Sequence, residues 1–204
     1  KPSGMILICG PTGSGKTTTL YAMLNNIDFM THNVITVEDP IECVLRNASQ
    51  IEVNPKAEIT FASSLRSILR QDPDVIVVGE VRDEESASIA LRAAQTGHQV
   101  FATMHSTSNI ASIVRLLDLG ISPVLMASGL DLVISQRLIR LLCENCKEPA
   151  ELSPTQIKQF HKDKINYTDI YQPAGCKKCR HTGYKGRTGI YDMIILTDKI
   201  KESM

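Results

Sequence analysis

The residues with the clearest capacity for chemistry are 10–17, with the sequence GPTGSGKT. They match the pattern G-x-x-x-x-G-K-[ST], in which a glycine-rich backbone turns successive N–H groups toward phosphate oxygens. Lys16 then reaches the β- and γ-phosphates of a nucleotide, and the Thr17 hydroxyl coordinates Mg²⁺. The residues predicted to bind the nucleotide are Gly10, Pro11, Thr12, Gly13, Ser14, Gly15, Lys16, Thr17 and Thr18.

The flanking sequence supports this prediction over a glycine-rich turn with a chance lysine. Residues 5–9 are apolar and predict a buried strand, and residues 18–24 predict a helix. The positive end of that helix faces the same anion as the loop. A strand, a loop and a helix in this order are the setting that a phosphate-binding loop requires.

Polar residues follow three further apolar segments. Ligands of an open α/β sheet bind beyond the carboxyl ends of its strands, so these residues are expected near the phosphate-binding loop. They are Glu38, Asp39 and Glu42 after residues 33–37, Glu80 after residues 75–78, and His105 after residues 99–104.

Glu80 is the first candidate for the residue that orients or deprotonates an attacking water, with a solvated loop carboxylate as the alternative. Gly79 stands where such sites usually carry an aspartate, so Mg²⁺ would rely on Thr17, the phosphates and waters, with Glu38 or Asp39 assisting. His105 would hydrogen-bond the γ-phosphate or the water, although a structural role stays open. The candidate catalytic residues are Glu80, Lys16, Glu38 and His105.

Three arginines have two open interpretations. Arg66 and Arg70 are expected one helical turn apart on one face of a helix over residues 61–70, and Arg82 lies close to Glu80 in the sequence. They form salt bridges with nearby carboxylates, or they stabilise phosphate charge within one subunit or across an interface.

The composition limits the class of protein. The chain has 204 residues, enough for one α/β domain with a small appendage, and its net charge is zero, which gives no global attraction to nucleic acid. The sequence contains no apolar run of membrane-spanning length. We expect no signal peptide, and we expect a fragment of a longer protein.

The remaining elements predict a parallel sheet whose faces are covered by helices. Asp83 is the predicted N-cap of a helix that extends through Ala94. Further helices are predicted over residues 109–119 and 123–134, and a short strand over residues 50–53.

Four of the six cysteines form two C-x-x-C pairs, Cys143/Cys146 and Cys176/Cys179. Two such pairs suit a closed, tetrahedral zinc site, with a redox dithiol pair or an iron–sulfur cluster as the alternatives. The region is polar, and a short helix capped by Ser153, with Pro154 and Gln156 following, is predicted between the pairs. All six cysteines are expected to be reduced thiols rather than disulfides, and Cys9 is expected in the core.

Together these motifs resemble the ATPase domain of the type II secretion and type IV pilus assembly ATPases. The resemblance rests on the phosphate-binding loop and on six further segments, which cover nearly the whole chain. These are residues 35–42, 65–74, 78–83, 97–105, 136–138 (Gln136-Arg137-Leu138) and 183–189, together with the four cysteines. Gly79 is part of the family pattern, and Cys43 departs from it where the family commonly has tyrosine.

The resemblance implies a RecA-like phosphate-loop core of mostly parallel strands over residues 1–142, a zinc-binding subdomain over residues 143–187, and a return to the core over residues 188–204. It also implies a hexameric motor, cytoplasmic and peripheral on the inner membrane, that hydrolyses ATP to assemble pilins or pseudopilins. Its implied partners are an inner-membrane platform protein and cytoplasmic adaptors.

The resemblance further implies an N-terminal domain outside this sequence that supplies interface arginines. The cysteines favour assembly over pilus retraction. Two alternatives remain: a nucleic-acid translocase of the same fold, which the zero net charge disfavours, and a zinc-dependent binding module with a regulatory nucleotide site.

Overall fold

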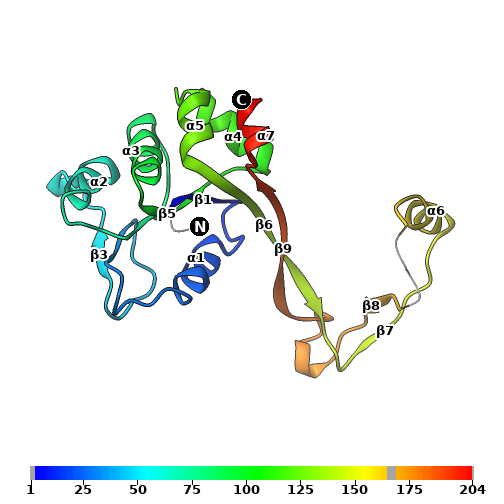
Figure 1. The fold of residues 1–204 in the computed structure, drawn as a ribbon. Coiled ribbons are helices and arrows are strands. Elements are labelled where there is room, and N and C mark those ends of the chain that lie inside the picture. The colour runs from blue at the N-terminus through cyan, green and yellow to red at the C-terminus, as the bar shows by residue number, and fades with distance from the viewer. Residues whose placement is uncertain (1–2, 165–168, 204) are drawn as a thin grey trace. The chain divides into compact units, whose positions relative to one another are not determined.

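The computed structural model describes residues 3–164 and 169–203 of the chain. Its main element is a seven-stranded sheet in the order β3-β2-β4-β5-β1-β6-β9 (Figure 1). All neighbouring pairs from β3 through β6 are parallel, so the predicted α/β fold with a mostly parallel sheet is confirmed. The strands are β1 (Gly4–Cys9), β2 (Val34–Glu38), β3 (Ser49–Glu52), β4 (Val75–Val78), β5 (Gln99–Met104), β6 (Leu130–Leu142) and β9 (Tyr184–Ile195).

The two faces of the sheet contribute to two apolar clusters. In β4, Ile76 and Val78 pack in one cluster while Val75 and Val77 pack in the other, because successive side chains of a strand point to opposite faces. All four side chains are buried, which explains why this strand is a continuous apolar run. Leu20 of α1 (Lys16–Leu24) belongs to the second cluster, and Leu65 of α2 (Phe61–Ile68) belongs to the first.

The helices agree with most of the predicted segments. Among the described residues, none of them has the length and apolar character needed to cross a bilayer. Their bounds are α1 (Lys16–Leu24), α2 (Phe61–Ile68), α3 (Glu84–Gln95), α4 (Asn109–Asp118), α5 (Pro123–Gly129), α6 (Pro154–Lys162) and α7 (Asp198–Glu202), with single 3-10 turns η1 (Pro55–Ala57) and η2 (Lys177–Cys179).

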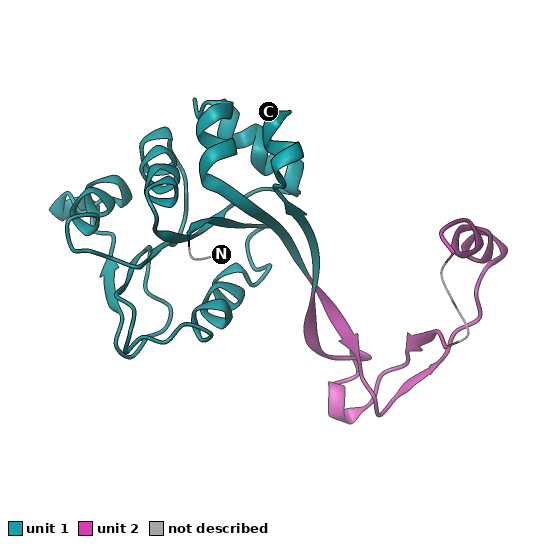
Figure 2. Cartoon of the chain, viewed as in Figure 1, with its two compact units in different colours: residues 1–137, 190–204 teal, residues 138–189 magenta. Residues whose placement is uncertain are grey.

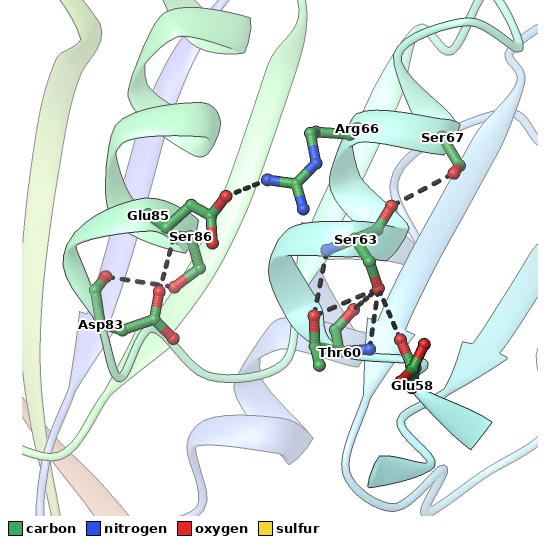
Figure 3. A network of polar contacts seen from close by, with 8 residues as sticks. All are labelled: Glu58, Thr60, Ser63, Arg66, Ser67, Asp83, Glu85 and Ser86. Carbon is green, nitrogen blue, oxygen red and sulfur yellow. Dashed lines mark hydrogen bonds and ion pairs between the residues drawn. The ribbon is translucent and has the colours of Figure 1, made fainter. Parts of the chain in front are cut away.

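Polar caps fix where α2 and α3 begin (Figure 3). The Thr60 side chain accepts a hydrogen bond from the Ser63 N–H, and the Asp83 side chain accepts one from the Ser86 N–H at 2.8 Å. Each cap satisfies an N–H that the first turn of a helix leaves unpaired. The predicted caps of α3 by Asp83 and of α6 by Ser153 are confirmed.

The predicted helix over residues 123–134 is wrong in its second half. α5 ends at Gly129, and Leu130 begins β6, which lies parallel to β1 with Ile8 opposite Ile134. A Cβ at Gly129 would lie 2.7 Å from the Leu91 carbonyl oxygen, so the helix approaches α3 closely here. The apolar run that follows, including β-branched Val133 and Ile134, is buried as a strand, because an apolar run of this length suits a buried strand as well as a helix.

The chain divides into two compact units (Figure 2). One unit contains residues 1–137 and 190–204, and the other contains residues 138–189. The second unit holds the antiparallel pair β7 (Lys147–Pro149) and β8 (Tyr171–Pro173), together with α6. Of its residues that the structure describes, only Cys143, Cys179 and Gly183 are buried, so apolar packing contributes little to its stability.

Candidate functional site

The phosphate-binding loop follows β1 and leads into α1, as the sequence predicts. Gly13 and Gly15 have φ angles of 74° and 86°, a left-handed conformation that is strained for residues with a Cβ. Gly15 is the N-cap of α1, and no side chain caps this helix end. The first N–H groups of α1 are therefore available to an anion.

Lys16 folds back over this loop. Its Nζ donates to the carbonyl oxygens of Gly10 and Pro11 at 3.0 and 3.3 Å. Burial lowers the pKa of Lys16, and the nearby Glu80 carboxylate opposes this shift, so the two predicted catalytic residues interact electrostatically. Ser14 Oγ is buried and lacks a hydrogen-bond partner among the described residues. An unsatisfied buried hydroxyl in a glycine-rich loop suits an anion bound there.

Gln136 of β6 also contacts this loop, and sequence reasoning assigned it no role. Its side-chain Nε2 donates to the Ser14 carbonyl oxygen at 2.7 Å, and its Oε1 accepts from the Thr19 hydroxyl at 2.7 Å. The only sequence signal was its place in the Gln136-Arg137-Leu138 segment, which does not reveal these contacts.

A cluster of charged side chains lies at the carboxyl ends of β2, β4 and β5. Arg82 Nε and Nη2 both donate to Glu80 Oε2, at 2.7 and 2.6 Å, and Arg82 Nη1 donates to Asp39 Oδ2 at 3.1 Å. His105 Nε2 lies 3.5 Å from Glu80 Oε1. The structure therefore groups Glu80, Asp39 and His105 as predicted. Of the two interpretations of Arg82, the structure agrees with the one in which it forms salt bridges with nearby carboxylates. The hydrogen bond to Glu80 also raises the pKa of Arg82.

Gly79 precedes Glu80 at a point of close backbone contact. Its N–H donates to the Val37 carbonyl oxygen at 2.7 Å, and its own carbonyl accepts from the Thr103 hydroxyl at 2.5 Å. A Cβ at Gly79 would lie 2.9 Å from that Val37 oxygen and 3.1 Å from Glu38 Cα. A side chain such as that of aspartate would require the β2 backbone to shift, which gives a steric reason for the glycine.

Glu38 is the most enclosed of the predicted catalytic residues, with 4% of its surface exposed. Its Oε1 accepts from Thr36 Oγ1 at 2.6 Å and from Gln50 Nε2 at 2.9 Å, and its Oε2 accepts a short hydrogen bond from the Tyr21 hydroxyl. Burial, followed by this contact, raises the pKa of Tyr21, so its hydroxyl stays protonated. The carboxylate that approaches the loop threonine is instead that of Glu42, whose Oε1 accepts from Thr17 Oγ1 at 3.4 Å.

Three further basic residues, Arg66, Arg70 and His98, lie in separate environments. Arg66 pairs with Glu85 of α3 (Figure 3). Arg70 lies beyond the C-cap residue Leu69 and is therefore outside α2, whereas the predicted helix extended through residue 70. His98 follows α3, and its Nδ1 lies 2.9 Å from the Ala93 carbonyl oxygen, a local structural contact.

The four predicted metal ligands form one cluster in the second unit. The Sγ atoms of Cys143, Cys146, Cys176 and Cys179 all lie within 4.8 Å of one another. The Sγ distances are 4.0 Å for Cys143–Cys176 and 3.8 Å for Cys146–Cys179. Four sulfurs at about 2.3 Å from one zinc ion would lie about 3.8 Å apart, whereas a disulfide requires about 2.05 Å.

Backbone N–H groups surround two of these sulfurs. Cys179 Sγ accepts from the N–H groups of Cys176 and Gly183, at 3.1 and 3.3 Å, and Cys146 Sγ accepts from the Gly175 N–H at 3.3 Å. The first of these contacts is the main reason why the pKa of Cys179 is lowered to about 6. Such donors stabilise thiolates, which are the form that binds metals. The donor set therefore fits a tetrahedral, thiolate-bound ion.

Comparison with known sequences decides the family. The model of the Type II/IV secretion system protein family, T2SSE, matches residues 1–204. The chain belongs to this family. It is 48% identical over 202 residues to the type II secretion system ATPase E of Vibrio cholerae. The matched region covers 99% of this chain and 40% of that protein. The family resemblance inferred from the motifs is confirmed.

Two further comparisons agree with this assignment. The type II secretion system protein E of Aeromonas hydrophila is 46% identical over 204 residues, or 100% of this chain and 41% of that protein. The crystal structure of the pilus retraction motor PilT with bound ADP matches with a TM-score of 0.70 and 33% identity, over 99% of this chain and 50% of that chain. The chain thus spans about 40% of the length of the curated relatives it matches.

Proposed function

We propose that the chain binds ATP with Mg²⁺ through residues 10–18 and hydrolyses it. The observation that carries this proposal is the grouping of Lys16, the uncapped start of α1 and the carboxylate of Glu80, which interacts electrostatically with Lys16. The Ser14 hydroxyl, which lacks a hydrogen-bond partner among the described residues, and the left-handed glycines fit a phosphate group in the loop. A solved relative, PilT, carries ADP.

Glu80 is the proposed general base. It would orient a water and accept its proton as the water oxygen bonds to the γ-phosphorus and the bond to the bridging oxygen breaks. Mg²⁺, held by Thr17, would neutralise phosphate charge. His105 lies beside Glu80 Oε1 and would contact the water or the γ-phosphate. Glu38 or Asp39 would assist at the Mg²⁺ side of the site.

The four cysteines are proposed to hold one zinc ion in a closed, structural site, within a subdomain assigned to residues 143–187. The spacing of the sulfurs supports this proposal, as does the scarcity of buried side chains among the described residues of the surrounding unit. A structural zinc ion contributes on the order of 10 kcal/mol to folding. Residues 1–142 and 188–204 would form the ATPase core.

The biological role that we propose is a motor that powers pilin or pseudopilin assembly in type II secretion or type IV pilus biogenesis. Such a motor would be a homo-hexamer on the cytoplasmic face of the inner membrane, in contact with a membrane platform protein and cytoplasmic adaptors. Membership of the secretion family and the similarity to the ATPase E of Vibrio cholerae support this role.

The test of the nucleotide site is binding of a fluorescent ATP analogue in the presence of Mg²⁺. Lys16→Ala removes the loop cation and should abolish measurable binding, because the phosphates then lack their closest positive side chain. Lys56→Ala removes an exposed lysine on η1 and should bind as the unaltered chain does. Equal affinity for the chain and the Lys16→Ala variant would overturn the proposal.

A further inference from the structure

Gln136 is a buried polar residue beside the phosphate-binding loop, with 2% of its surface exposed. It lies on β6 just after Ser135, which is opposite Cys9, the last residue of β1. Gly10 opens the loop at this point, and a Cβ there would lie 2.5 Å from the Gln136 carbonyl oxygen. The close packing of the two strands thus brings the Gln136 side chain to the loop.

The chemistry of its partners fixes the orientation of the Gln136 amide. The Ser14 carbonyl oxygen can only accept a hydrogen bond, so the –NH₂ group of Gln136 must face it, at 2.7 Å. The Gln136 oxygen then faces Thr19 and accepts a hydrogen bond from that hydroxyl, also at 2.7 Å. One side chain therefore joins the loop and helix α1 through two hydrogen bonds of defined direction.

Fixing the Ser14 carbonyl also fixes the next N–H group. A trans peptide is planar, and its C=O and N–H bonds point in opposite directions. The Ser14 carbonyl points toward Gln136, so the Gly15 N–H points away from Gln136. Gly15 is the left-handed N-cap of α1, a position whose N–H serves an anion in a phosphate-binding loop.

We propose that Gln136 is a positioning residue that holds the phosphate-binding loop in the conformation that accepts phosphates. This inference rests on the proposed nucleotide site and deepens it. Without Gln136, the Ser14 carbonyl loses a buried donor, and the flexible glycines of the loop allow other conformations. The apparent affinity for nucleotide falls in proportion to the fraction of molecules whose loop is correctly arranged.

The decisive measurement is the rate of binding of a fluorescent ATP analogue with Mg²⁺ by stopped flow. Gln136→Met keeps the side-chain length and removes both hydrogen bonds. The association rate constant should fall about 10-fold, because two hydrogen bonds no longer select one loop conformation. The dissociation rate constant should change by less than about twofold, because Gln136 acts on the free loop rather than on the nucleotide. A residue that only supports folding would change neither constant in the folded protein.

A second pair of variants tests the same contact from α1. Thr19→Val removes the hydroxyl at constant shape and should lower the association rate constant about threefold, the effect of one neutral hydrogen bond. Thr19→Ser keeps the hydroxyl and should bind at the unaltered rate. This pair also decides the matter if Gln136→Met does not fold. Equal association rates for the two Thr19 variants would overturn the inference.

Asn33→Leu is the matched control. The Asn33 side-chain amide also donates to backbone carbonyls, those of Gln71 and Asp72, but at the amino end of β2 on the opposite edge of the sheet. It should leave both rate constants unchanged. If the unaltered chain binds no nucleotide, the proposed site and this inference both fail. If the chain binds but folded Gln136→Met associates as fast, only the inference fails.

Discussion

Arg82 donates two hydrogen bonds to one oxygen of Glu80, from Nε and Nη2 to Oε2 at 2.7 and 2.6 Å. The other oxygen, Oε1, has the His105 ring 3.5 Å away. The Glu80 side chain is 18% exposed, so this arrangement orients a carboxylate that water still reaches. An oriented carboxylate with one oxygen turned toward an imidazole is suited to accept a proton from a nearby water.

The first prediction concerns this carboxylate. Glu80→Gln keeps the shape of the side chain and removes its charge and basicity. In a hydrolysis-competent assembly, we expect turnover to fall by a factor of about 10² or more, while nucleotide affinity changes little. Steady-state phosphate release at saturating MgATP measures turnover, and titration with a fluorescent analogue measures affinity.

Glu58→Gln, which makes the same change at an exposed carboxylate, should leave both quantities unaltered. If Glu80→Gln keeps its turnover, the role of general base must be assigned to another carboxylate. Glu42 is then the next candidate, because its Oε1 lies 3.4 Å from the Thr17 hydroxyl.

The second prediction concerns the residue before Glu80. Gly79→Ala adds a Cβ 2.9 Å from the Val37 carbonyl oxygen and 3.1 Å from Glu38 Cα, both backbone atoms of β2. The segment that follows β4 must move away from β2, so we expect the free energy of unfolding to fall by about 1–3 kcal/mol. Denaturant titration of the chain measures the loss. A free energy of unfolding within about 0.5 kcal/mol of the unaltered value would show that β2 yields without cost.

The order of strands and helices could be predicted because each element carries its own local signal. The apolar run of β4 and the polar caps of α3 and α6 appear directly in the sequence. The change from α5 to β6 could not be predicted, because residues 123–134 are apolar enough for either structure. The decision comes from tertiary packing, namely the close approach of Gly129 to Leu91 and the pairing with β1.

The positions of site residues could be predicted where a motif specifies the backbone. The hydrogen-bond partners of long side chains could not, because they depend on the tertiary structure. The loop was predicted from its motif and its flanking segments, and the four cysteines were predicted as ligands from their spacing. The sequence placed Glu38 near the nucleotide but could not reveal that Tyr21, Thr36 and Gln50 hold its carboxylate. The role of Gln136 could not be predicted for the same reason, because its contact with Ser14 joins residues 122 positions apart in the sequence.

The third prediction concerns the contact between Tyr21 and Glu38. Tyr21→Phe leaves Glu38 Oε2 without a donor among the described residues, while Thr36 and Gln50 still serve Oε1. Because the carboxylate is buried, we expect the free energy of unfolding to fall by about 1–3 kcal/mol. Tyr191→Phe, at a tyrosine 52% exposed on β9, should have little effect. Equal losses in denaturant titrations of the two variants would contradict a specific role for the Tyr21 hydroxyl.

The last prediction concerns the cysteine cluster. The purified chain should contain about one zinc ion, because four thiolates complete a tetrahedral site. Cys176→Ser removes one ligand and should lose the metal, and residues 138–189 should then become sensitive to protease, since few described side chains in this unit are buried. Nucleotide binding through residues 10–18 should persist, because that loop lies in the other compact unit. Cys43→Ser, at an exposed cysteine outside the cluster, should retain the zinc. Elemental analysis that finds iron, or no metal, in the unaltered chain would refute the zinc assignment, and full zinc content in Cys176→Ser would exclude this cysteine from the site.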